Sequence, residues 1–178
     1  FRAFVAPGRG EGFFPAITMP TRRLLAMPYF LALRSGYPLQ ALQLLSGLAW
    51  LLTGVAADRL ARRLWPQAPL AAVLAGALTL SATPDFFTNA LTGISYQLSI
   101  LAYLAALLAG LAWLQGGSRL ALLAAPACVA LGSWTTDVAL SAWALTPLLW
   151  LCLPARGRRR FVALGILWYL AALPYLFV

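Results

Sequence analysis

Very few side chains in this sequence are suited to acid–base chemistry. The 178 residues include no His, and the acidic residues are only Glu11, Asp58, Asp85 and Asp137. Asp85 precedes Asn89 by four residues, and Asp137 follows two threonines. A carboxylate can act as a general base, but Asp is also a favoured N-terminal cap of a helix. Because Asp85 and Asp137 each stand next to an expected helix start, the pattern favours capping and leaves catalysis as the alternative.

The basic residues offer a complementary chemistry, since guanidinium groups bind phosphate. All 13 basic residues are Arg. Arg22, Arg23 and Arg34 surround an apolar run near the N-terminus and are candidates to hold a lipid phosphate. The remaining arginines fall mostly between apolar runs and form no continuous basic face, which argues against nucleic acid as a partner. The headgroups of anionic lipids are the expected counter-charge.

Other kinds of site find little support in the sequence. Without His there is no Ser/His/Asp arrangement, and neither a G-x-G-x-x-G nor a G-x-x-x-x-G-K-[ST] motif occurs. Cys128 and Cys152 lie in apolar segments without C-x-x-C spacing, so we interpret them as small hydrophobic residues. We therefore expect no metal site and no resident cofactor.

The composition indicates an integral membrane protein. Hydrophobic residues make up 62% of the chain and charged residues 10%, with a mean hydropathy of +0.84, whereas soluble domains have about a quarter charged residues. A helix needs roughly 20 apolar residues to cross a bilayer. We therefore expect an all-α, polytopic membrane helix bundle with about six transmembrane helices. The expected spans cover residues 38–57, 69–82, 89–113, 120–132, 138–152 and 161–178, the last interrupted by Pro174.

The N-terminal part, residues 1–37, is more polar and contains four prolines. We expect it to lie on the outer face as an amphipathic segment, and residues 38–178 to form the transmembrane bundle. Within it, residues 21–33 predict a short interfacial helix that buries Leu24, Phe30 and Leu31 while Arg22 and Arg23 meet headgroups. An irregular loop folded over the bundle is the alternative.

The distribution of arginine predicts the orientation in the membrane. The loops after the first, third and fifth spans carry eight arginines, whereas the intervening loops carry Asp85 and Asp137 and no Arg. Positive loops stay in the cytoplasm, so we expect a multi-pass protein of the bacterial inner membrane with both aspartates outside. The eight arginines are Arg59, Arg62, Arg63, Arg119, Arg156, Arg158, Arg159 and Arg160.

Four stretches of the sequence follow one another in an informative order. An amphipathic segment (residues 13–54) precedes an Arg-rich turn (ADRLARRLWP), a polar elbow (ATPDFFTNALTGISYQ) and the stretch GSWTTDVALSAWALTPLLWL. This order resembles the multi-span glycosyltransferases of the GT-C class, which include the protein O-mannosyltransferase and lipid-sugar arabinose transferase groups. Pro84 matches the proline elbow of that class, and Asp137 matches the acid before a later helix, with Thr136 where the family has Lys.

The resemblance implies transfer of a sugar from a polyprenyl-phosphate donor on the outer face of the membrane. An active enzyme of this kind would bind the polyprenyl-phosphate sugar donor, with a divalent cation as a further candidate cofactor. The family's catalytic acid lies in the first outer loop; here Glu11 is the acid upstream of the amphipathic segment, and Gln97 stands where the family often has an acid. The chain would be a fragment or a degenerate relative of such an enzyme. The candidates are then Glu11, Asp85 and Asp137 for catalysis and Arg22, Arg23 and Arg34 for the lipid phosphate.

A second hypothesis comes from a different class. Few polar groups, no cofactor ligands and many small and aromatic residues are also typical of a non-catalytic transmembrane subunit. Such a subunit would pack against other membrane proteins in a larger assembly, for example a photosynthetic or respiratory complex.

Overall fold

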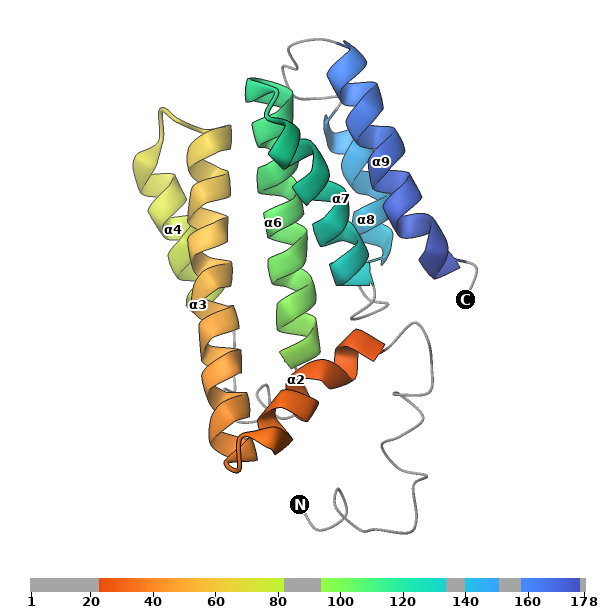
Figure 1. The fold of residues 1–178 in the computed structure, drawn as a ribbon. Coiled ribbons are helices and arrows are strands. Elements are labelled where there is room, and N and C mark those ends of the chain that lie inside the picture. Colours follow the sequence, from red (N-terminus) through yellow and green to blue (C-terminus); the bar gives the residue numbers. More distant parts are fainter. Residues whose placement is uncertain (1–22, 82–93, 134–139, 151–157, 177–178) are drawn as a thin grey trace.

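The computed structural model describes residues 23–81, 94–133, 140–150 and 158–176, and within these ranges the chain is helical with no β-strand. This confirms the all-α class (Figure 1). The described helices are α2 (Arg23–Arg34), α3 (Pro38–Leu64), α4 (Pro69–Ser81), α6 (Ile94–Gly116), α7 (Arg119–Ser133), α8 (Leu140–Leu149) and α9 (Arg158–Leu176).

Helix α6 lies at the centre of the bundle. It packs against α3, α7 and α9, while α4 packs on the outer side of α3 and α8 on α9 and α7. Successive helices from α3 onward run in alternating directions (Figure 1). The C-terminus of α3 therefore lies at the same end of the bundle as the N-termini of α7 and α9, and we call this the arginine end. At the opposite end, which we call the α2 end, α2 lies obliquely across the bundle.

Two helices in the described ranges are long and apolar enough to cross a membrane. These are Pro38–Leu64 and Tyr96–Gly116. Pro69–Ser81 and Arg119–Ser133 are apolar but shorter. The expected arrangement of six spans thus remains a proposal, whereas the apolar helical bundle is observed.

The expected limits of α4 and α7 agree with the structure to within a residue, whereas α6 continues to Gly116, three residues beyond its expected end. The limits of α3 and α9 also differ. Helix α3 continues for two turns beyond residue 57, because Asp58 accepts a hydrogen bond from Arg62 one turn later at 2.8 Å, and because the arginines of its last turn suit the negative end of the helix dipole. Helix α9 begins at Arg158, three residues before its expected start. It also continues through Pro174 to Leu176, so the expected interruption is wrong.

The bundle interior combines small residues with tryptophans. Trp143, Trp150 and Trp168 are almost fully buried and contact one another, with ring centroids 5.7 Å apart for Trp143 and Trp168 and 4.6 Å for Trp150 and Trp168. Glycines make room for them, because a Cβ on Gly110 would lie 2.7 Å from Cζ2 of Trp150, and one on Gly132 would overlap Cζ2 of Trp143. Close helix contact through small residues is typical of membrane bundles.

Candidate functional site

The sequence candidates are distributed unevenly between described and undescribed parts of the chain. Glu11, Arg22, Asp85 and Asp137 lie outside the described residues, as does the side chain of Arg23. The expected helix caps at Asp85 and Asp137 therefore stay predictions. Arg34 is described: its side chain is exposed in the last turn of α2.

The structure does place the helix ends that flank these candidates. The C-terminus of α4 and the N-terminus of α6 border residues 82–93, and the C-terminus of α7 and the N-terminus of α8 border residues 134–139. All four helix ends lie at the α2 end (Figure 1). The chain segments that carry Asp85 and Asp137 thus join helices at the end that α2 crosses.

Helix α2 is fixed to this end by a small apolar cluster and a tight turn. Ala32 is 1% exposed and packs with Leu42 of α3 and Ile94 of α6. The Ser35 hydroxyl donates to the carbonyl of Ala32 at 2.7 Å, and Gly36 adopts a φ of 77°, a value that favours glycine. The chain therefore reverses sharply between α2 and α3.

The large aliphatic and phenyl side chains described in the last turns of α2 are exposed. Phe30 and Leu31 are each 54% exposed, and Ala32 occupies the inward position instead. The helix expected at residues 21–33 is thus present from Arg23 to Arg34. Burial of Phe30 and Leu31 in lipid stays a prediction, since they are not buried against the protein, and the side chain of Leu24 lies outside the described residues.

Polar side chains inside the bundle link neighbouring helices. Ser46, fully buried on α3, donates to Oε1 of Gln97 on α6 at 2.7 Å. Ser99 of α6 donates to the carbonyl of Gly132 on α7 at 3.3 Å. Reasoning from the sequence singled out Gln97 only as a replaced acid and missed its serine partner; an isolated polar residue within an apolar span was the available signal.

A second polar group joins α6, α8 and α9 at the centre. The hydroxyls of Tyr103 and Thr146 are hydrogen-bonded at 2.7 Å, and the ring of Tyr103 meets Trp143 edge to face with centroids 5.0 Å apart. The indole Nε1 of Trp168 donates to the carbonyl of Trp143 at 2.8 Å. That carbonyl lies four residues before Pro147, which has no N–H to offer it. Trp168 thus supplies the donor that Pro147 lacks.

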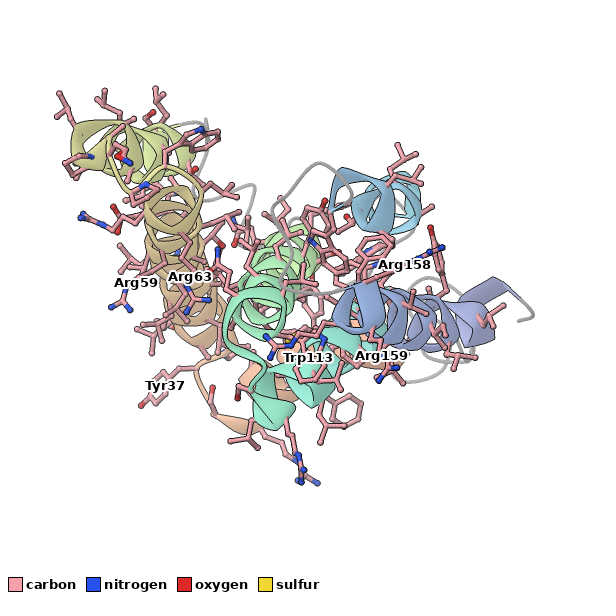
Figure 2. All side chains as sticks on the ribbon, turned by 90° about the horizontal axis from the view of Figure 1, so that it is seen from above. Tyr37, Arg59, Arg63, Trp113, Arg158 and Arg159 are labelled. Atoms are coloured by element: carbon pink, nitrogen blue, oxygen red, sulfur yellow. The ribbon has the colours of Figure 1, made fainter. Side chains whose placement is uncertain are left out.

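The arginine end is built around the last turns of α6. Arg63 of α3 donates to the carbonyl of Leu108 at 3.1 Å. Trp113 donates from Nε1 to the carbonyl of Arg160 at 2.9 Å, and the guanidinium of Arg160 lies 5.7 Å from the centre of a Trp113 ring. Figure 2 looks onto this end, with Arg59 and Arg63 on one flank and Arg158 and Arg159 on the other.

The described residues hold no group of three or more His, Cys, Asp or Glu side chains that would bind a metal ion. The candidate carboxylates Glu11, Asp85 and Asp137 lie outside these ranges, so this finding does not test whether they bind a divalent cation. Comparison with protein-family models, with curated proteins and with solved structures finds no match to this chain.

Proposed function

We propose that this chain is a multi-pass membrane protein whose α2 end carries the membrane-embedded part of a glycosyltransferase that uses a polyprenyl-phosphate sugar. One observation supports this most: the helix ends around both aspartate-containing segments meet at the end that α2 crosses. The described helices that border three candidate-bearing segments, namely α2, the pair α4 and α6, and the pair α7 and α8, thus begin or end on one side of the bundle. The resemblance to GT-C enzymes in the order of segments favours sugar transfer as the chemistry.

The pattern of exposure supports the membrane part of the proposal. Large apolar side chains such as Leu70 and Leu78 of α4 and Leu120 of α7 are 71%, 67% and 80% exposed, while the buried positions include Ser46, Ser99 and other small polar residues. A soluble monomer rarely exposes large apolar side chains along so many of its helices. In lipid the arrangement is favourable, because small residues pack the helices closely and polar ones bond between them. We place the arginine end in the cytoplasm of a bacterium.

The proposed reaction assigns a role to each kind of candidate. A carboxylate from Glu11, Asp85 or Asp137 removes the proton from an acceptor hydroxyl. The acceptor oxygen then forms a bond to the anomeric carbon of the sugar, and the bond from that carbon to the phosphate oxygen breaks. The leaving polyprenyl phosphate keeps the electron pair, and guanidinium groups of Arg22, Arg23 or Arg34 stabilise its charge.

The test is sugar transfer by the intact protein in membranes, with polyprenyl-phosphate mannose and polyprenyl-phosphate arabinose as donors. Asp85→Asn and Asp137→Asn retain a capping oxygen but cannot act as a base, and Asp58→Asn at the arginine end is the matched control. A catalytic base at Asp85 or Asp137 predicts a loss of about 100-fold or more in the corresponding variant, with folding retained, and a base at Glu11 predicts the same loss in Glu11→Gln. Asp58→Asn should transfer sugar at the parental rate. No transfer by the parent protein would contradict the proposal.

A specific observation favours the second candidate, a non-catalytic subunit of a larger membrane complex. In the described part of the bundle the interior hydroxyls of Ser46, Ser99 and Tyr103 all bond to neighbouring helices, so these groups serve packing. A subunit of this kind predicts that the chain, extracted from native membranes in mild detergent, has fixed-stoichiometry partners by native mass spectrometry. It also predicts that neither Asp85→Asn nor Asp137→Asn changes that stoichiometry.

A further inference from the structure

The indole N–H of Trp143 is a buried donor that its surroundings leave unsatisfied. Trp143 is 1% exposed. In the part of the chain that the structure describes, its Nε1 atom has no hydrogen-bond partner. Such a donor loses its bond to water on folding and gains none in return, which costs free energy. Buried donors in folded proteins are almost always bonded, so an acceptor is expected at this position.

The ring of Trp143 is held in place by neighbours on three other helices. It meets Tyr103 of α6 edge to face with centroids 5.0 Å apart, and its centroid lies 5.7 Å from that of Trp168 of α9. The backbone of Trp143 is fixed as well, because its carbonyl accepts the hydrogen bond from Trp168 at 2.8 Å. On α7 the ring fills the space beside Gly132. The indole therefore cannot turn towards a distant acceptor.

The ring edge that carries Nε1 lies near the contact between α6 and α7. A Cβ on Gly132 would overlap Cζ2 of Trp143, which is separated from Nε1 by one ring atom, and would lie 3.3 Å from Cβ of Ala102. One turn earlier on α6, Ser99 is 1% exposed, and its hydroxyl donates to the carbonyl of Gly132 at 3.3 Å. This bond is longer than the distance of about 2.8 Å that is usual for a hydroxyl donor. The Ser99 oxygen also has lone pairs that accept hydrogen bonds.

We propose that this junction of α6, α7 and α8 binds one internal water molecule, which accepts the hydrogen bond of Trp143 Nε1 and donates to Oγ of Ser99. Internal waters bond to buried polar groups that folding otherwise leaves unsatisfied. Nε1 is closed off from the surface, so a lipid or sugar oxygen would reach it only if the helices separated. The site lies close to the α2 end, since Trp143 is in the first turn of α8 and Gly132 in the last turn of α7 (Figure 1). The inference is independent of sugar transfer.

NMR spectroscopy of the full chain in detergent micelles, with ¹⁵N-labelled tryptophan, tests this site. The indole signal of Trp143 is assigned by its cross-peaks with the ring of Tyr103 and by its loss in Trp143→Phe. Its Hε1 proton should give a cross-peak with water. The indole of Trp168 is the matched control, because it is equally buried and donates to a carbonyl of the chain. No water cross-peak at Trp143, or an equally strong one at Trp168, would overturn the proposal.

A second measurement counts the water itself, because a hydroxyl proton that exchanges with bulk water gives the same cross-peak. The relaxation dispersion of ¹⁷O-labelled water reports long-lived internal waters and is insensitive to hydroxyl protons. Trp143→Phe should lose one such water, and so should Ser99→Ala, which adds no bulk and removes the second partner. Trp113→Phe is the control and should lose none, since its indole bonds to the carbonyl of Arg160. An unchanged count in Trp143→Phe and Ser99→Ala, or an equal loss in Trp113→Phe, would refute the water site.

Discussion

At the scale of single residues, the structure assigns roles that the sequence left open. Trp168 illustrates this, because its indole donates to a carbonyl that Pro147 leaves without a helical donor. The sequence shows a proline in one apolar run and a tryptophan in another. Their relation depends on how α8 and α9 are rotated against each other, which a single sequence does not specify. For the same reason Gln97 was noticed and its partner Ser46 was not.

Trp168→Phe should therefore destabilise the protein, since it leaves the buried carbonyl of Trp143 without a donor, at a cost of about 1–3 kcal/mol in addition to lost packing. In a Pro147→Ala background the helix can supply its own N–H to that carbonyl. The same Trp168→Phe change should then cost about 1 kcal/mol less. Unfolding in SDS, followed by circular dichroism in a double-mutant cycle, measures the difference. Identical losses in both backgrounds would contradict the proposed compensation.

At the scale of helices, the sequence predicts which segments are helical better than it predicts the residues at which each helix begins and ends. The limits of α4 and α7 agree with expectation to within a residue, because Pro69 marks one start and the Gly117–Ser118 turn marks the other. The charged ends of α3 and α9 were interpreted as loops, yet both are helical. At the end of α3, charge does not end the helix, because the Asp58–Arg62 pair and the helix dipole favour its continuation. The three arginines that begin α9 lie at the positive end of its dipole, so the dipole does not explain that extension. The candidate site could be predicted only as far as the end of the bundle, since its aspartates lie outside the described residues.

The contact between α7 and α8 supplies a prediction at this scale. Gly132→Ala should destabilise the bundle by about 1–3 kcal/mol, because its Cβ would overlap the ring of Trp143, which is buried and has no room to move. Gly165→Ala in α9 is the matched control: nothing lies within 4 Å of its Cβ position. That change should stabilise the helix by up to about 1 kcal/mol. Thermal unfolding in detergent should thus shift in opposite directions, and equal shifts would refute the close contact.

At the scale of the whole molecule, the two ends of the helix bundle differ in the charged residues that they carry. Arginines collect at one end, and α2 with the flanks of the aspartate segments lies at the other (Figure 1). The alternation of Arg-bearing and Asp-bearing loops along the sequence predicts this separation. Outward apolar residues and inward small polar ones support a lipid environment for the body between the two ends.

Two serines allow a matched measurement of this separation. Ser81 ends α4 at the α2 end, and Ser118 lies between α6 and α7 at the arginine end; both are exposed. The neighbouring Gly117 is unsuitable for cysteine substitution, because its φ of 74° favours glycine and a Cβ there would lie 2.7 Å from Nη2 of Arg160. Replacement of Cys128 and Cys152 by Ala supplies the background that has no other thiol.

Labelling of Ser81→Cys and Ser118→Cys with a membrane-impermeant maleimide in intact bacterial cells tests whether the two ends of the bundle lie on opposite sides of a membrane. Ser81→Cys should be labelled from outside, whereas Ser118→Cys should be labelled only after the membrane is opened. Labelling of both positions from the same side, or of both in a soluble fraction, would contradict this arrangement.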